Sequence, residues 1–575
     1  MCRGFGQASC LVLAWVFAGV ANGATPQPAA RPNILVILAD DLGWSDLGCY
    51  GGEIRTPHLD RLAAGGLRFT QAYNSSRCCP SRASLLTGLY PHQAGIGRFV
   101  GGGGGEKFPG YGGRLADRCA TLAEVLGPAG YATFACGKWH VGEPGPVARG
   151  FDAFYGFVHG YGVDSWNPRT MVRLPPAESA PTPTARPFFA TDAITDHGLG
   201  FLADARAAAR PWLLYVAFQA AHFPLQAPAE LTARYVPIYE RGWDVLRAER
   251  LERMKKIGLV PADIALPPRE EIDAPAVARR LGSMTADGRN PAWESLDGRR
   301  RTDLARRMAV YAAMVESMDA NVGRLVDALQ TAGELDRTLI LFMSDNGACA
   351  EWEPFGFDLD PADYRNRRPG HGVDGATPGK PNVLHEGAAL AAMGGPQATT
   401  LFSYGSGWAN LSNTPLALYK HFTHEGGIRT PLIAHWPATI PDPGALRPQP
   451  AHVMDVMATC VEITNAAYPP AARPHAVPLE GRSLVPALAG RPVEPRTLVF
   501  EHEHNAAIRR ADWKLVGRGV IAGGDVREGA RWQLFDVAAD PAERHDRADE
   551  RPDLVAELAA MFEAEARRTL VLPAP

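Results

Sequence analysis

The sequence predicts an α/β protein in which a central, mostly parallel sheet lies between helices, followed by a smaller C-terminal α+β domain with a short antiparallel sheet. Continuous apolar, β-branched runs alternate with helical or irregular stretches, one long segment has helical periodicity, and the pattern changes near residue 490. The apolar runs, which are typical of buried parallel strands, cover residues 33–39, 131–135, 212–218, 338–343 and 431–436.

The amino terminus has the pattern of an export signal. A basic residue, Arg3, precedes an apolar run over residues 11–20 and the small residues Ala21-Asn22-Gly23. This run is too short to span a bilayer, because a spanning helix needs about 20 apolar residues. We therefore predict a cleaved signal peptide over residues 1–23, a periplasmic or secreted protein, and no stable membrane association. An uncleaved anchor is the alternative.

The first apolar run, residues 33–39, ends in Asp40-Asp41-Leu42-Gly43, which predicts a buried strand followed by a turn. Between Leu304 and Leu329 the apolar residues recur at steps of three and four, which predicts a helix with one buried stripe. The Gly101–Gly105 run predicts a flexible loop with a structural or lid role.

Residues 351–412 are rich in Gly, Pro and Asn and have little periodicity. We expect a long functional insertion near the carboxyl edge of the sheet, because long irregular segments in compact domains usually serve function. Within it, Tyr404 and Trp408 are candidates to shape a pocket.

A chain of 575 residues exceeds the size at which one core stops growing, so we predict a large domain over residues 31–490 and a small one over residues 491–575. In the small domain, short strands alternate with polar turns and a closing helix begins at a proline. The expected strands cover residues 498–500, 513–516 and 532–535, and the expected helix covers residues 552–568.

The composition excludes several classes of protein. Charged residues make up 21% and apolar residues 46%, which is ordinary for a soluble globular protein. The net charge of -4 is small for this length, so nucleic acid is not an expected partner. Seven of the nine cysteines follow residue 23 without CxxC spacing, which excludes a disulfide framework. One or two bridges are compatible with export, and their pairing stays open.

The strongest local motif runs from Cys78 to Gly88. Pro80 suits a first helical position and Gly88 can end the helix, which places Cys78 just outside a helix N-terminus. Unpaired N–H groups and the positive end of the helix dipole make such a terminus an anion site. From these residues alone, Cys78 is either a thiolate nucleophile or a buried cysteine.

This motif, Cys-x-Pro-Ser-Arg followed by Leu-x-Thr-Gly, resembles the signature of type I sulfatases, whose cysteine a separate formylglycine-generating enzyme oxidises to formylglycine. The resemblance implies the alkaline-phosphatase-like fold and the hydrolysis of a small-molecule sulfate ester, with Cys78 as the modified residue. Its likeness is closest to bacterial arylsulfatases, which favours an aryl sulfate. Further segments that resemble the family, in the family's order, are residues 32–43, 56–60, 137–140, 344–347, 412–415, 418–421 and 424–427.

Oxygen donors follow two of the predicted strands. Asp40 and Asp41 come after the first, and Asp345 and Asn346 come after the run at 338–343, so all four can converge at the carboxyl edge of the sheet. Hard oxygen ligands suit calcium or magnesium. For each pair alone, a simple turn is the alternative. The resemblance favours one Ca²⁺ per active site, with the modified Cys78 as a further ligand.

Positive charge and proton carriers are expected around such an ion. Lys138 and His140 are two residues apart, so on an extended backbone they project to the same face. Arg82 follows Cys78 by four residues and can reach the same anion. A satisfied core histidine or a solvated lysine is the alternative for each. The resemblance implies that the catalytic residues are Cys78, Arg82, Lys138, His140, His222 and Lys420, and we expect His58 and His424 to be structural.

The resemblance also implies a mechanism. One hydroxyl of hydrated formylglycine attacks sulfur with Asp345 as base, while His222 or Lys420 protonates the leaving alcohol. His140 then takes the proton of the second hydroxyl, and sulfate leaves. The surrounding cations and the metal spread the charge of the group in transfer.

Two other functions stay open at this point. A phosphatase or phosphonate monoester hydrolase of the same superfamily would typically have Asp-His in place of Asp345-Asn346. An inactive sulfatase-like binding protein would be expected if Cys78 stayed a thiol. Within the sulfatases, the sequence does not distinguish an aryl sulfate from a sulfated sugar or sterol.

Overall fold

A computed structural model describes Met1 and residues 31–101, 107–176, 187–271, 289–351, 354–362, 380–381 and 383–575. Apart from Met1, the predicted signal peptide lies outside these residues, as does most of the 101–105 loop. None of the helices described is both long enough and apolar enough to span a bilayer. The seven cysteines from Cys49 onward are all free, so the described part contains no disulfide.

The large sheet contains ten strands. They are β1 Asn33–Ala39, β2 Leu67–Tyr73, β3 Ala132–Lys138, β4 Ala153–Phe157, β5 Val172–Leu174, β6 Trp212–Ala217, β7 Thr338–Ser344, β11 Arg429–His435, β12 Leu446–Arg447 and β13 Ala451–His452. Their order is β12-β2-β11-β7-β1-β6-β3-β4-β5, and β13 also pairs with β2. The pairs β7-β1, β1-β6, β6-β3 and β3-β4 are parallel, whereas β11 is antiparallel to both β2 and β7.

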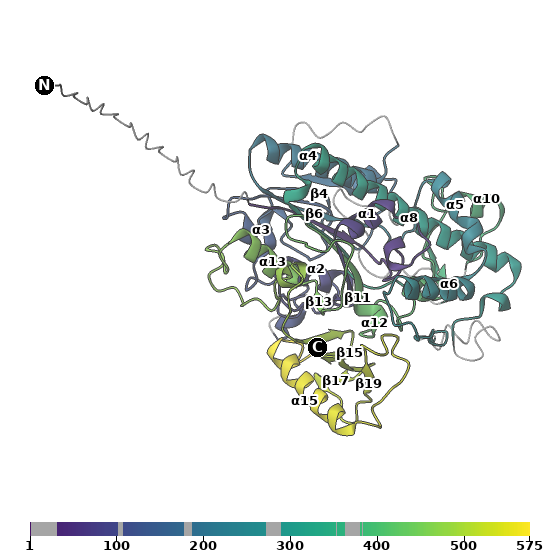
Figure 1. Cartoon of the computed structure of the whole chain (residues 1–575). Helices are drawn as coiled ribbons and strands as arrows, with labels where there is room; N and C mark the ends of the chain where they lie inside the picture. Colours follow the sequence, from purple (N-terminus) through teal and green to yellow (C-terminus); the bar gives the residue numbers. More distant parts are fainter. Residues whose placement is uncertain are drawn as a thin grey trace. The chain divides into compact units, whose positions relative to one another are not determined.

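Helices cover both faces of this sheet, as the continuous apolar runs predicted. Alternate residues of β1 enter two different cores: Leu35 and Ile37 face one, and Val36 and Leu38 face the other. Figure 1 shows α1, α4 and α8 over one face and α2, α3 and α13 over the other. The helices are α1 Pro57–Gly65, α2 Cys78–Thr87, α3 Leu122–Leu126, α4 Ala190–Ala207, α5 Ala229–Tyr239, α6 Trp243–Lys256, α8 Gly298–Thr331, α10 Gly387–Ala392, α11 Ser406–Ser412, α12 Glu425–Ile428, α13 Asp455–Thr464, α14 Val485–Leu488 and α15 Pro552–Arg568.

The five predicted strand runs are confirmed as β1, β3, β6, β7 and β11, with ends that differ by at most three residues. The periodic segment at 304–329 is the centre of α8, which begins where the side chain of Asp297 accepts a hydrogen bond from the N–H of Arg300. Strand β2 was missed because its half-buried middle residues are polar, so it lacks a continuous apolar run.

Described parts of the 351–412 segment form the small antiparallel sheet β10-β8-β9 and helix α11. Its strands are β8 Phe357–Leu359, β9 Lys380–Pro381 and β10 Leu401–Phe402. Trp408 does not shape a pocket, which corrects our expectation: it is fully buried and packs edge-on against Trp243. Its indole N–H is satisfied by the carbonyl of Leu304, so this aromatic ring is part of the core.

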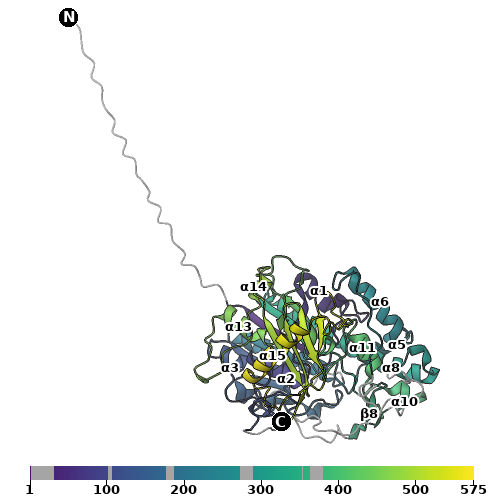
Figure 2. The same cartoon turned by 90° about the horizontal axis from the view of Figure 1, so that it is seen from below.

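The carboxyl-terminal region contains an antiparallel sheet and helix α15, as expected (Figure 2). The strand order is β14-β15-β16-β19; the strands β14, β16 and β19 were predicted, and β15 was not. Its strands are β14 Thr497–His502, β15 Asn505–Arg510, β16 Trp513–Gly517 and β19 Gln533–Asp536; β17 Ile521–Ala522 and β18 Asp525–Val526 form a separate two-stranded sheet. Its core includes Tyr73 of β2 and Ile428 of α12, so this sheet packs directly on elements of the large one. The domain boundary near residue 490 stays a prediction.

Candidate active site

Four neighbouring strands, β7, β1, β6 and β3, run parallel and end at the same edge of the sheet. The predicted site residues that follow or end these strands are Asp345 and Asn346 after β7, Asp40 and Asp41 after β1, His222 after β6, Lys138 at the end of β3 and His140 just beyond it. Parallel pairing therefore brings these residues together although they span some three hundred positions of the chain.

Two further segments reach the same edge of the sheet next to β7, one after strand β2 and one before strand β11. Strand β2 runs in the direction of β7, because both are antiparallel to β11. The chain that leaves β2 therefore enters α2 and Cys78 at this edge. Lys420 precedes α12 and the start of β11, whose first residues lie at the same edge.

Helix α2 begins at Cys78 and not at Pro80, so our expectation that Cys78 lies outside the helix was wrong by two residues. Proline is tolerated at the third helical position because the N–H groups of the first turn have no partner within the helix. Gly88 ends the helix in the left-handed region, at φ 72°, as expected. Cys78 thus sits in the first turn, where helical N–H groups favour an anion.

The acidic and amide side chains are in direct contact and fully buried. The amide of Asn346 donates to Asp41 Oδ1 at 2.7 Å, and the backbone N–H of Asp41 points to Asp345 Oδ1 at 3.4 Å. Asp40, Asp41, Asp345 and Asn346 are each at most 1% exposed. Three carboxylates in one dry site repel one another, so the site requires compensating positive charge.

Two oxygens of this group have no hydrogen-bond partner. Within the described part of the chain, Asp40 Oδ1 and Asn346 Oδ1 are buried and accept no hydrogen bond. Buried acceptors of this kind are rare and often mark the place of an ion or an ordered water. Because both are hard oxygen donors, the residues present fit a calcium or magnesium ion.

Three cationic side chains surround the carboxylates. Lys138 Nζ lies 2.5 Å from Asp40 Oδ2, and Arg82 Nε donates to Asp345 Oδ2 at 2.9 Å. Lys420 Nζ lies 2.9 Å from Asp41 Oδ1. Burial and the charge of Asp345 raise the pKa of Asp40 to about 7, against the attraction of Lys138. Burial also acts to raise the pKa of Asp41, but His222 and Lys420 outweigh it, so that pKa is lowered.

Cys78 faces His140. Ligand atoms of Cys78, Cys79 and His140 lie within 4.8 Å of one another. Burial acts to raise the pKa of the Cys78 thiol, but a hydrogen bond with Cys79 and the charge of Lys138 bring it well below its usual range. Burial lowers the pKa of His140 to about 3, and neither of its ring nitrogens has a partner in the described residues. His140 is therefore a neutral imidazole with an available lone pair.

His222 is oriented by its own loop. Its Nδ1 lies 2.5 Å from the carbonyl oxygen of Phe223, so Nδ1 carries the proton that it donates. Its Nε2 then faces Asp41 Oδ2 at 3.6 Å. In the neutral form of His222, Nε2 therefore carries no proton, and this is the nitrogen that points into the site.

Aromatic rings line one side of this group. Phe99 meets the His140 ring edge-on with centroids 5.1 Å apart, and Tyr161 lies 5.9 Å from the ring of His222. Phe99 and Tyr161 are themselves 6.4 Å apart. We call Phe99, Tyr161 and Phe223 the aromatic wall; Tyr161 and Phe223 are in contact with centroids 5.6 Å apart. No sequence motif marks this wall, because its residues are far apart in the chain.

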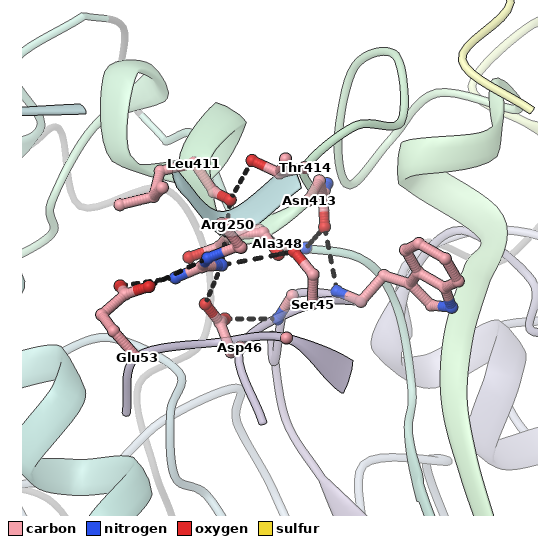
Figure 3. A network of polar contacts seen from close by, with 12 residues as sticks. Ser45, Asp46, Glu53, Arg250, Ala348, Leu411, Asn413 and Thr414 are labelled. Carbon is pink, nitrogen blue, oxygen red and sulfur yellow. Dashed lines mark hydrogen bonds and ion pairs between the residues drawn. The ribbon is translucent and has the colours of Figure 1, made fainter. Parts of the chain in front are cut away.

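Asn413 is a second residue that was missed, although it lies in the segment 412–415 quoted for the resemblance. Its Oδ1 accepts from the N–H groups of Trp44 at 3.3 Å and Ala348 at 3.1 Å (Figure 3). Its Nδ2 donates to the carbonyls of Leu418 at 3.0 Å and Gly426 at 2.8 Å. One buried amide thus joins the loop after β1, the loop after β7 and the segment that carries Lys420.

Arg250 of α6 fixes the continuation of the same loop after β1. Figure 3 shows its guanidinium between Asp46 and Glu53. It lies 2.9 Å from Asp46 Oδ1, donates at 2.6 and 3.1 Å to the two oxygens of Glu53, and reaches the carbonyl of Leu411 at 2.9 Å. Such a bidentate, largely buried pairing holds the chain after Asp41 in one conformation.

Comparisons with known proteins agree with this geometry. A family model described as Sulfatase matches residues 32–466. The chain is 33% identical to the Arylsulfatase of Klebsiella aerogenes, over 78% of this chain and 89% of that protein, and 32% identical to an uncharacterized sulfatase of Schizosaccharomyces pombe over 95% of each. It is also similar to the crystal structure of Ps i-CgsB in complex with k-i-k-neocarrahexaose, with 25% identity, a TM-score of 0.60 and 93% of each chain covered. The chain therefore belongs to the sulfatase family and is a hydrolase of sulfate esters.

Proposed function

We propose that this protein hydrolyses an aryl sulfate to the phenol and inorganic sulfate, using a formylglycine made from Cys78 and one calcium ion. The observation that carries the proposal is the convergence at one sheet edge of buried oxygen donors, three cations, a neutral histidine and the first turn of a helix that begins at Cys78.

Calcium fits the donor set. The ion would be held by Asp40, Asp41, Asp345 and Asn346 together with the modified side chain at position 78, and the unpartnered oxygens of Asp40 and Asn346 support this placement in the described site. A bound ion supplies positive charge that stabilises the sulfate group as charge builds up on its oxygens. Arg82 and Lys138, which pair with Asp40 and Asp345, would add to that charge.

The hydrated aldehyde would supply two hydroxyl groups on one carbon, one to attack sulfur and one whose deprotonation expels sulfate and restores the aldehyde. Asp345 would take the proton of the attacking hydroxyl. His140 would take the proton of the second hydroxyl, and its unpartnered ring nitrogens in the described site suit this role.

The leaving alcohol needs a proton donor, and Lys420 fits this role better than His222. The Nδ1–H of His222 donates a hydrogen bond to the Phe223 carbonyl, so its Nε2 has a proton to offer only when the ring is charged. The ammonium of Lys420 carries three protons and is held by Asp41 at the site.

The aromatic wall favours an aryl group over other alcohols, because flat rings stack or meet edge-on with a planar phenol. A sulfated carbohydrate is the second candidate, since the structure of Ps i-CgsB was solved with k-i-k-neocarrahexaose. A formylglycine-generating enzyme would be the maturation partner. The signal predicted over residues 1–23 supports export to the periplasm or beyond.

The test is to follow Cys78 and turnover in parallel. Trypsin cuts after Arg77 and Arg82 and releases a short peptide that contains Cys78, whose mass reports the exchange of the thiol for a carbonyl oxygen. We expect the wild type to carry that change and to hydrolyse nitrophenyl sulfate much faster than nitrophenyl phosphate. Cys78→Ala should abolish turnover, while Cys79→Ala, a neighbour of equal burial, should keep it. An unmodified peptide from an active enzyme would overturn the proposal.

A further inference from the structure

A second group of metal-binding side chains lies outside the active site. It consists of His421, His502 and Glu503, and we call it the histidine cluster. One ligand atom from each residue lies within 4.8 Å of the other two. His421 directly follows Lys420, whereas His502 ends β14 and Glu503 belongs to the turn that leads to β15.

Glu351 orients His421 in the manner of a metal ligand. Its Oε1 lies 2.6 Å from His421 Nε2, while His421 Nδ1 lies 2.9 Å from Glu503 Oε2. Histidines that bind metals usually donate their other N–H to a carboxylate, which fixes the tautomer and the ring orientation. With the proton on Nε2, the lone pair of Nδ1 faces a carboxylate oxygen. That contact is repulsive unless a cation or a second proton lies between the two atoms.

His502 gives an independent indication of a ligand. It is 0% exposed, and among the described residues neither of its ring nitrogens has a hydrogen-bond partner. Its Nε2 lies 3.5 Å from Glu503 Oε1, too far for a normal hydrogen bond but within the spacing of two ligands of one ion. A buried imidazole without a hydrogen bond is costly, and a metal ion would remove that cost.

We propose that the histidine cluster is a second divalent-cation site, distinct from the calcium site, that binds a zinc-type ion through His421 Nδ1, His502 Nε2 and Glu503. Imidazole nitrogens suit zinc and similar ions, whereas calcium prefers oxygen ligands. Ligand atoms about 2.0–2.2 Å from a tetrahedral zinc ion are roughly 3.3 Å apart. The two contacts of Glu503, 2.9 Å to His421 Nδ1 and 3.5 Å to His502 Nε2, lie on either side of this value. A water molecule completes the set on the side where Glu503 is exposed.

The position of this site gives the bound ion a structural effect. Glu503 also forms an ion pair with Arg77, the residue before Cys78. Asn505, the first residue of β15, donates to the carbonyl of His421 at 3.1 Å. The ion would therefore hold the turn between β14 and β15 against the segments that carry Lys420 and Cys78.

Cobalt(II) is the probe, because it substitutes for zinc and gives visible absorption bands in a site with nitrogen ligands. The experiment uses the full-length Cys78→Ala protein after treatment with a chelator, so that Cys78, Cys79 and His140 cannot form a thiolate site that also binds cobalt. We expect one equivalent of Co²⁺ to bind with tetrahedral-type bands that zinc abolishes and calcium does not. Glu351→Gln should weaken binding about 10- to 100-fold.

His502→Ala should remove the bands, and the matched control His504→Ala, an exposed histidine two residues along the same turn, should keep them. Glu503→Gln should also remove the bands, and because Glu503 is half-exposed this variant serves if His502→Ala fails to fold. Circular dichroism checks that each variant is folded. The proposal is overturned if the parent protein binds no cobalt in this way, as a doubly protonated His421 would predict, or if the bands survive both His502→Ala and Glu503→Gln.

Discussion

Replacing Asn413 with alanine tests whether one buried amide holds the active-site loops in place. The substitution leaves four buried groups without their partner: the N–H groups of Trp44 and Ala348 and the carbonyls of Leu418 and Gly426. Each unpaired buried group costs about 1–3 kcal/mol. Water that enters the vacated space can satisfy about half of them, so we expect a net loss of about 2–6 kcal/mol.

For a folded unit of this size, the entropy of unfolding is roughly 1.1 kcal/mol/K, so the melting temperature of Asn413→Ala should fall by about 2–5 °C. The loops that lose this link carry Asp41 and Asp345, the expected calcium ligands. We therefore expect the calcium concentration for half-maximal activity to rise about tenfold or more, as it does when residues behind metal ligands are changed.

Asn410→Ala is the matched control. Asn410 lies in α11, three residues before Asn413, is only 3% exposed, and its side chain makes one long hydrogen bond of 3.4 Å to Glu270. Differential scanning fluorimetry and a calcium titration of nitrophenyl sulfate turnover measure both effects in both variants. If Asn413→Ala loses no more stability and no more calcium affinity than Asn410→Ala, the positioning role of Asn413 is refuted.

Three further predictions concern buried charge, pH and metal. Lys514 Nζ lies 2.9 Å from both Glu425 Oε1 and Glu543 Oε1, and all three side chains are fully buried. Lys514→Met should therefore lower the free energy of unfolding, measured by chemical denaturation, by about 3–5 kcal/mol. Adding Glu543→Gln should restore part of that loss, because it removes one of the two unpaired carboxylates. Burial lowers the pKa of His452 from 6.5 to about 3, and its Nδ1 accepts the N–H of Met454 at 3.2 Å. As the pH falls, the unfolded chain therefore binds a proton at His452 before the folded chain does. The free energy of unfolding should decrease as the pH drops from 6.5 towards 3, by up to about 1.4 kcal/mol per pH unit. His452→Asn should show a shallower slope, and equal slopes in the two proteins would contradict the assignment. Chelation of calcium should abolish turnover and lower the melting temperature, and calcium should restore both; activity that survives exhaustive chelation would exclude an essential ion.

Local patterns were sufficient to predict that the four oxygen donors converge, whereas His222 and Lys420 were predicted only from the family resemblance. Asp40-Asp41 and Asp345-Asn346 each follow an apolar run, and parallel strands that end at one edge bring such residues together without further information. The antiparallel strand β11 was detected as a strand, but its direction is set by the order of strands in the sheet, which a single run of apolar residues does not encode.

The residues that were missed depend on packing between distant segments. Asn413 lies in an Asn-Thr-Pro stretch that reads as a turn, and its four partners lie in the segments around residues 44, 348, 418 and 426. Trp408 was assigned to a pocket because its segment is rich in glycine and proline, yet Gly407 lets the backbone of α11 approach Trp243 and places Trp408 in the core. No local sequence pattern distinguishes a tryptophan in the core from one that lines a pocket.

The carboxyl-terminal sheet participates in shaping the active site, although a separate domain was expected there. Tyr73 ends β2, the strand that leads to Cys78, and its hydroxyl donates to Glu425 at 3.0 Å and accepts from Arg509 of β15. Glu425 begins α12, just after the segment with Lys420, and pairs with Lys514 of β16. The segment that carries Cys78 and the segment that carries Lys420 are therefore both fixed by the same small sheet. Because these contacts are buried and charged, a shift of that sheet would leave unpaired charge beside both segments, so its position and the geometry of the catalytic residues are coupled.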